Sequence, residues 1–186
     1  MGEPSLLLHR ACIYQQVPFI EKMDKSKKTF RIIMTVIILL TVAIIWGHSF
    51  MTPEMSTEES SFVKEIVEAV VQSVSNNEAF TIPEVVIRKS AHFIEYAILG
   101  LELVIFITIN KSLPNDDKKR GLIKKLLSLY PTAFVLSLFV GSIDETIQHF
   151  TGRYSSVWDV LLDLAGASFS ILVFLLIRVL FLRRRK

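Results

Sequence analysis

Four ionisable side chains share one face of an otherwise apolar segment, RKSAHFIEYAILGLEL, at residues 88–103. At about 100° per residue, an α-helix brings these four within an arc of about 80°: Arg88, His92, Glu95 and Glu102. Imidazole and carboxylate groups can transfer protons or bind metal ions, and inside a membrane they are costly and mark functional sites. The pattern therefore predicts a membrane helix that turns one side to lipid and the other to a polar site.

Two further segments carry carboxylates at helical spacing. In DETIQH, at residues 144–149, Asp144 and Gln148 share one helix face. Glu145 and His149 form a second pair one turn apart on the adjacent face. The apolar segment that follows carries small residues on the face of its carboxylates, which allows helices to approach closely. We predict that these segments converge in an acid/base site with five catalytic candidates: His92, Glu95, Asp144, Glu145 and His149.

The turn TGRYSSVWD, at residues 151–159, contains the best anion-binding candidate, Arg153. Its planar guanidinium can bind a carboxylate or a phosphate through two hydrogen bonds. The residues expected to bind a substrate or an anion are Lys89, Gln148, Arg153, Asp159 and Asp163. The turn would thus bring a positive charge to the mouth of the carboxylate cluster.

Several of these residues also have a purely structural interpretation. The SxxD pattern that ends at Asp159 caps the start of a helix, where the helix dipole favours an acidic side chain. Arg88 and Lys89 could extend to lipid head groups. His149, close to the membrane interface, is equally compatible with a solvated position. Glu102 lies deeper in its helix, and the sequence defines no partner for it.

The sequence leaves the cofactor unknown. Imidazole and carboxylate ligands suit zinc or manganese, but the spacing of these residues does not define a metal site. No serine or cysteine nucleophile stands beside a base, and the HxxE and DExxQH patterns differ from the metalloprotease signature. The single cysteine, Cys12, excludes an intrachain disulfide.

Composition and charge pattern describe a membrane protein. The chain has 186 residues, of which 51% are hydrophobic, and a formal net charge of +3. The basic residues flank apolar runs, where they act as topology signals, and no binding motif supports a nucleic-acid partner. Four apolar segments are long enough to cross about 30 Å of hydrocarbon: residues 32–51, 84–109, 131–150 and 156–182. The predicted fold is therefore all-α and polytopic, with four transmembrane helices.

The loops between these segments predict the orientation. Residues 25–31, 111–125 and 183–186 are basic, whereas residues 52–84 are acidic. By the positive-inside rule, both termini are expected in the cytoplasm of a multi-pass cell-membrane protein, with the polar cluster near the outer face. A short external amphipathic helix is expected in the acidic loop, and a short basic surface helix before Tyr130.

The chain divides into three parts by the same reasoning. Residues 1–26 lack clear periodicity and are interpreted as a leader, either a misassigned start or a poorly ordered segment. Residues 27–182 form the predicted membrane domain. Residues 183–186 form a basic cytoplasmic tail.

The chain contains the motifs KSAHFIEYAILG, DETIQHFTGRYSSVWDVLLDLAGA and WGHSFMTPEMSTEESS. Together they resemble the VanZ-like family of small bacterial integral membrane proteins, over about residues 27–178. The family pattern, carried over to this sequence, highlights Lys89, His92, Glu95, Tyr96, Gly100, Asp144, Glu145, Gln148, Gly152, Arg153, Asp159 and Gly166. At Asp163 many relatives carry asparagine, so the resemblance does not imply a required carboxylate there.

The resemblance implies a role in the cell envelope. The founding member of the VanZ-like family is associated with antibiotic resistance in Gram-positive bacteria, specifically to teicoplanin. The mechanism of this resistance is distinct from a change in the stem peptide of peptidoglycan. Resistance need not extend to every relative, since many are expected to serve ordinary envelope physiology.

Three classes of function remain open at the level of sequence. The first is an envelope enzyme whose acid/base or metal site acts on a lipid-linked envelope precursor or another cell-surface substrate. The second is a noncatalytic protein whose polar network holds the helices together and binds lipid head groups or the lipoglycopeptide itself. The third, a proton-coupled carrier, fits intramembrane carboxylates but has few helices and no repeat. The lipid bilayer is the partner common to all three, and the oligomeric state is open.

Overall fold

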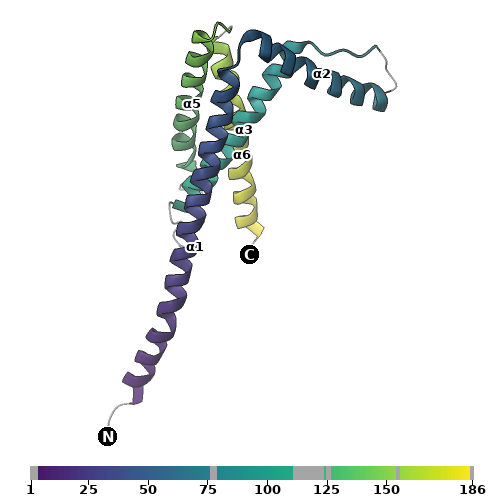
Figure 1. The fold of residues 1–186 in the computed structure, drawn as a ribbon. Coiled ribbons are helices and arrows are strands. Elements are labelled where there is room, and N and C mark those ends of the chain that lie inside the picture. The colour runs from purple at the N-terminus through teal and green to yellow at the C-terminus, as the bar shows by residue number, and fades with distance from the viewer. Residues whose placement is uncertain (1–3, 76–78, 111–123, 125–126, 154–155, 185–186) are drawn as a thin grey trace.

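The computed structural model describes residues 4–75, 79–110, 124, 127–153 and 156–184. Within these ranges the chain is all-helical, as predicted, and its helices are shown in Figure 1: α1 (Pro4–Ser49), α2 (Pro53–Ser75), α3 (Glu84–Asn110), α5 (Tyr130–Phe150) and α6 (Val157–Arg184). The basic surface helix expected before Tyr130 falls on residues that lie largely outside the described ranges.

Proline marks the start of two helices. α3 begins at Glu84, directly after Pro83, and α5 begins at Tyr130 with Pro131 in its first turn. Proline suits these positions because the N–H that it lacks would have no partner in a first turn. α1 runs without a break from Pro4, so the segment interpreted as a leader forms part of the same helix as the first predicted span.

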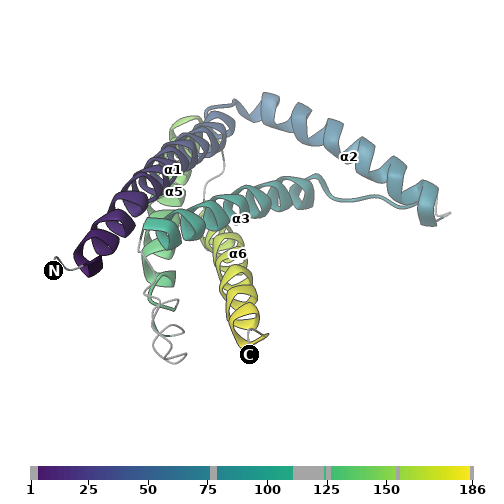
Figure 2. The same ribbon diagram turned by 90° about the horizontal axis from the view of Figure 1, so that it is seen from below.

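α3 lies at the centre of the helical bundle. It packs against α6, α1, α5 and α2, and α5 also contacts α6 and α1. Figure 1 shows α1, α3, α5 and α6 running along the bundle, while α2 projects sideways from one end. The view from below in Figure 2 shows the same projection of α2 away from α5 and α6. Both termini lie toward the other end of the bundle.

The buried core and the exposed surface are both apolar. The core includes side chains of α3 and α6 that are fully buried: Tyr96, Leu99, Val104, Ala167 and Ile171. On the outside, Leu39 of α1 is 62% exposed, Phe139 of α5 is 64% exposed and Leu172 of α6 is 52% exposed. So much exposed apolar surface is unfavourable in water and is expected of helices that face lipid.

Three helical segments are long and apolar enough to cross a membrane, by length and composition: Ser26–Ser49, Glu84–Asn110 and Val157–Phe181. α5 spans 21 residues and buries the polar side chains of Asp144, Glu145 and Gln148. It is not among the candidate spans found in the described part of the chain. The chain is therefore a membrane protein, and its fourth span stays a prediction.

Two glycines allow α3 and α6 to lie in direct backbone contact. A Cβ atom on Gly166 would lie 2.3 Å from the carbonyl oxygen of Phe93, and one on Gly100 would lie 2.6 Å from that of Ala167. Neither distance is sterically possible, so a larger residue would push the helices apart. This contact sets the separation of the two helices that carry His92 and Asp163.

α2 corresponds to the amphipathic helix predicted in the acidic loop, and it is tied to the start of α3. The Ser60 hydroxyl donates to Glu84 at 2.8 Å, and Glu68 accepts a hydrogen bond from the Ile82 N–H at 2.7 Å. On its exposed face, Phe62 and Val70 are 64% and 57% exposed. The position of α2 outside the membrane stays a prediction.

Candidate functional site

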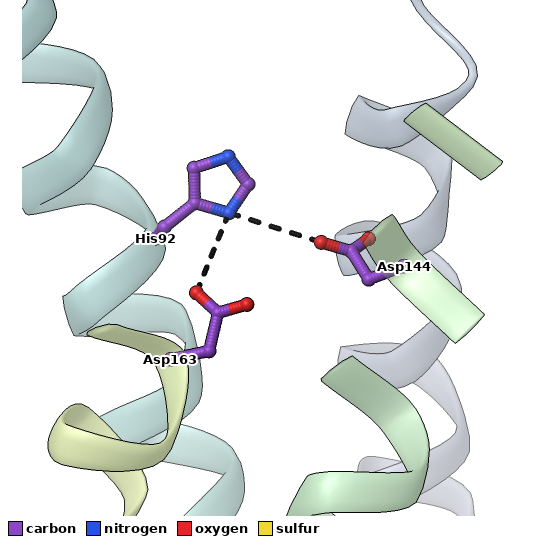
Figure 3. A group of neighbouring side chains, drawn as sticks. All are labelled: His92, Asp144 and Asp163. Carbon is purple, nitrogen blue, oxygen red and sulfur yellow. Dashed lines mark ion pairs between the residues drawn. The ribbon is translucent and has the colours of Figure 1, made fainter. Parts of the chain in front are cut away.

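His92, Asp144 and Asp163 point toward one another from three different helices, α3, α5 and α6 (Figure 3). His92 Nδ1 lies 3.9 Å from Asp144 Oδ2 and 3.9 Å from Asp163 Oδ1. Both carboxylates are buried, with relative exposures of 0% for Asp144 and 1% for Asp163. The three side chains are called the buried triad below.

Asp144 receives hydrogen bonds from two other residues. The Ser49 hydroxyl, at the last residue of α1, donates to Asp144 Oδ1. Gln148 Nε2, one turn further along α5, donates to Asp144 Oδ2 at 3.1 Å. These bonds fix the carboxylate in the orientation that faces His92.

Asp163 and its neighbours lack such partners. Among the described residues, neither carboxylate oxygen of Asp163 accepts a hydrogen bond, and His92 Nδ1 and the Tyr96 hydroxyl are also buried without a partner. Tyr96 and Asp163 face the same place on α5, because a Cβ on Gly141 would lie 3.6 Å from the Tyr96 hydroxyl and 3.7 Å from Asp163 Oδ2. Buried polar atoms are normally satisfied, so this group of unsatisfied atoms needs an explanation.

A polar cavity of about 240 Å³ adjoins the buried triad. Its lining includes two members of the triad, His92 and Asp163, together with charged or amide side chains from α3, α5 and α6: Arg88, Lys89, Glu145, Gln148 and Asp159. Arg153, from the turn between α5 and α6, completes this set. Cations and carboxylates therefore face one small space at the end of the bundle.

The turn that carries Arg153 has a defined geometry. Gly152 has a φ of 75°, in the left-handed region, and the Arg153 N–H donates to the Gln148 carbonyl at 3.0 Å. This is the Schellman arrangement that ends helices, and it favours glycine at that position. Arg153 Nη1 then donates to the carbonyl of His48 at 2.7 Å, which caps the end of α1. The pKa of the Arg153 guanidinium is lowered mainly because the group is buried, and secondly because the positive charge of Arg88 is near.

Two other polar residues of the cavity connect α6 to the rest of the bundle. Glu145 Oε2 accepts a hydrogen bond from the Ser156 N–H at 3.0 Å, just before α6 begins. Asp159, in the first turn of α6, pairs with Lys89 of α3 at 2.6 Å. The position of Asp159 in the first turn of α6 agrees with the capping interpretation, and the ion pair with Lys89 is a contact between helices that was not predicted.

An apolar groove of about 460 Å³ lies beside the polar cavity, between α2 and α3. Valine and isoleucine side chains form the apolar part of its wall: Val63, Val67, Ile82, Val86, Ile87 and Ile94. At its polar end, Glu95 pairs with His48 Nδ1 of α1 at 2.6 Å. Arg88, His92 and Arg153 line both the groove and the cavity, so the two spaces share a boundary.

A family model described as VanZ/LLP1 matches residues 33–178, which is most of the chain. The chain belongs to the VanZ/LLP1 family. This confirms the resemblance seen in its motifs. The match begins within α1 and ends within α6, so every residue of the buried triad, the cavity and the groove belongs to the VanZ/LLP1 region. No curated protein and no solved structure matched the chain.

The VanZ/LLP1 fold separates the predicted site residues into three groups. Seven of them line the cavity: Lys89, His92, Glu145, Gln148, Arg153, Asp159 and Asp163. Asp144 does not line it but contacts His92 within the buried triad. Glu95 instead faces the groove, where His48 is its partner. His149 is exposed and packs edge-on against Phe150, outside the polar cavity. Glu102, further along α3, accepts a hydrogen bond from Thr41 at 2.9 Å.

Sequence reasoning missed two residues of this VanZ/LLP1 site, His48 and Ser49. They end the first apolar span and belong to the motif WGHSFMTPEMSTEESS, but neither is among the predicted site residues. The available signal was the pair of polar side chains on the last turn, immediately before the acidic loop. Whether this pair belongs to a site depends on which helix packs against α1. The sequence of α1 alone does not define that neighbour.

Proposed function

We propose that this VanZ/LLP1-family protein binds the anionic head group of a lipid-linked molecule of the cell envelope and carries out acid/base chemistry on it. The observation that carries the proposal is the junction of the polar cavity with the apolar groove, both lined by Arg88, His92 and Arg153. An amphiphile could place its charged group in the cavity and its chain in the groove, since ligand sites combine apolar walls with a few polar anchors.

The available hydrogen-bond donors support an anionic ligand. A guanidinium has five N–H donors, and Arg153 uses one nitrogen on the His48 carbonyl. No hydrogen bond or ion pair joins Arg88 to another residue of the described chain. Two guanidinium groups at one small cavity favour a phosphate, which accepts several charge-assisted hydrogen bonds.

The acid/base group in this proposal is Glu145. It lines the cavity, so it would lie close to a head group bound there. A carboxylate can exchange a proton with a bound substrate, whereas Arg153 would orient the substrate and neutralise its charge. Glu95 and His149 lie outside the cavity and are not assigned a step.

We also propose that α5 is the fourth span, that both termini are cytoplasmic and that the cavity opens at the outer face of the membrane. The basic residues beside the predicted inner loops support this orientation. The end of the bundle that carries α2 lies away from both termini (Figure 1). A lipid-linked precursor or a lipoglycopeptide at the cell surface could then reach the cavity.

A noncatalytic role is the second candidate, and the pairing inside the cavity favours it. Lys89 is paired with Asp159, and Glu145 accepts a backbone hydrogen bond from Ser156. Polar contacts between membrane helices contribute about 0.6 to 2 kcal/mol each, so several together could serve mainly to hold the bundle. Such a protein would bind a head group without changing it.

Binding of a simple amphiphile tests the proposed ligand class. Full-length protein in neutral detergent would be mixed with dodecyl phosphate or dodecanol, and bound molecules counted by native mass spectrometry. We expect binding of the phosphate, and Arg153→Lys should weaken it about tenfold because the lysine loses the planar fork. Arg178→Lys is the matched control, since Arg178 is exposed on α6 and lies outside the cavity.

Equal binding of dodecanol and dodecyl phosphate would contradict an anionic ligand, as would an unchanged affinity in Arg153→Lys.

Glu145→Gln separates the enzyme from the noncatalytic binder, since the amide keeps the shape of the side chain but loses its basicity. An enzyme would retain the ligand yet lose teicoplanin resistance, or growth under envelope stress, at unchanged membrane abundance. A noncatalytic binder would keep both.

A further inference from the structure

We propose that the buried triad, His92, Asp144 and Asp163, binds a divalent transition-metal ion of the zinc or manganese class. The three side chains converge from α3, α5 and α6, as Figure 3 shows. Neutral imidazole and carboxylate are the ligands that these two ions share. The inference stands on the triad alone and does not depend on which molecule occupies the polar cavity.

The spacing of the triad is close to that of a ligand set. Zinc ligands lie about 2.0–2.2 Å from the ion, so two of them are about 3.3–3.6 Å apart in a tetrahedron. His92 Nδ1 is 3.9 Å from one oxygen of each aspartate, and the three ligand atoms lie within 4.8 Å of one another. Side-chain rotations that move each atom by about half an ångström would close the set around an ion.

A shared proton explains this spacing less well than an ion does. Hydrogen bonds that involve a charged group bring the two heavy atoms to about 2.5–2.9 Å. The distances of 3.9 Å from His92 to both aspartates exceed that range by about an ångström. The three groups thus face one another across a gap that is too wide for a direct hydrogen bond and suited to a small cation.

Asp163 gives the second, independent observation. It is only 1% exposed, and neither of its oxygens accepts a hydrogen bond within the described part of the chain. A buried carboxylate without a hydrogen-bond donor carries a large desolvation cost unless a proton or a cation neutralises it. A cation between His92, Asp144 and Asp163 would neutralise both carboxylates at once.

The bonds to Asp144 resemble the support that metal ligands receive. Ser49 and Gln148 each donate to this carboxylate, one to each oxygen. Groups that hydrogen-bond to a ligand orient it and raise metal affinity. The support comes from α1 and α5, so the site would be assembled only in the folded bundle.

The triad leaves coordination positions open toward the cavity. Three protein ligands are typical of sites that bind a metal and keep a position for water or substrate. His92 and Asp163 line the polar cavity, so a ligand there would reach the ion from that side. A metal in this position would polarise an oxygen of the bound head group.

Metal content tests the inference directly. Full-length protein would be purified, stripped with EDTA, dialysed against Zn²⁺ or Mn²⁺ and measured by inductively coupled plasma mass spectrometry. We expect about one ion per chain, as for a mononuclear site. Asp163→Asn and His92→Gln should each weaken binding by at least about tenfold, because each replaces a strong ligand with a neutral amide that binds these ions weakly.

Glu102→Gln is the matched control. Glu102 is a carboxylate on the same helix as His92, but its partner is Thr41 and it is not part of the triad. This variant should bind the ion as the unchanged protein does. Circular dichroism and gel filtration of every variant would separate the loss of a ligand from the loss of folding.

The inference is overturned if the reloaded protein holds no ion above the dialysis blank, or if folded Asp163→Asn binds as tightly as the unchanged chain. Arg153→Lys separates this result from the proposed function, because Arg153 is not a triad member. That variant should keep the metal while its affinity for dodecyl phosphate falls about tenfold. Loss of both in a folded Arg153→Lys protein would count against an independent metal site.

Discussion

Asp144 depends on a hydroxyl group from a helix outside the buried triad. Ser49, at the end of α1, is fully buried, and its hydroxyl donates to Asp144. We predict that Ser49→Ala destabilises the protein by about 1–3 kcal/mol, because it leaves a buried acceptor without its donor. Thermal unfolding of the purified protein, followed by circular dichroism, would measure the change.

Ser142→Ala is the control for this substitution. Ser142 is an exposed serine on α5 whose hydroxyl donates only to the Leu138 carbonyl of its own helix, at 2.8 Å. Its removal should change the stability by less than about 0.5 kcal/mol. Equal losses in the two variants would mean that the bond from Ser49 to Asp144 has no special weight.

The contact between α3 and α6 positions two members of the triad. We predict that Gly166→Ala costs about 1–3 kcal/mol or more, because the new Cβ would lie 2.3 Å from the Phe93 carbonyl and the helices must separate. The same displacement should weaken metal binding, because His92 and Asp163 lie on the two helices. Thermal unfolding and metal content would be measured on the same sample.

Gly47→Ala provides the comparison within a helix. A Cβ on Gly47 would meet no heavy atom within 4 Å. Alanine is favoured over glycine in a helix by about 0.5–1 kcal/mol, so this variant should be as stable as the unchanged protein or slightly more stable. If Gly166→Ala behaved in the same way, close packing of α3 on α6 would not determine the fold.

The orientation of the whole bundle determines which compartment the cavity faces. Ser75 is the last residue of α2, and Lys28 lies near the start of the candidate span Ser26–Ser49 in α1; both are exposed. In a chain without Cys12, we predict that an impermeant thiol reagent labels Ser75→Cys in intact cells but labels Lys28→Cys only after lysis. The physical reason is the excess of Lys and Arg beside the inner loops.

Labelling after lysis is the control, since both cysteines should then react. The opposite pattern in intact cells would place the cavity on the cytoplasmic side and remove cell-surface molecules as ligands. Labelling of both positions before lysis would mean that α1 does not separate Lys28 from Ser75 across the membrane.

The sequence alone determined the starts of α3 and α5 and the apolar spans, because their causes are local, but it did not predict that α1 begins at Pro4. Proline before Glu84 and at residue 131 marked the starts of α3 and α5, and apolar runs marked the spans. The helical period of 3.6 residues placed Asp144 and Gln148 on one face, where the structure joins them at 3.1 Å. The family followed from motifs that are also contiguous in the chain.

Only the tertiary structure decided which polar residues meet. Ser49 joins Asp144 across 95 positions of sequence, Glu95 pairs with His48 and not with the triad, and His149 lies outside the cavity. These outcomes depend on how far each helix is rotated and how closely it crosses its neighbour. Periodicity fixes the faces of one helix, whereas backbone contacts such as that at Gly166 fix which faces of two helices come together.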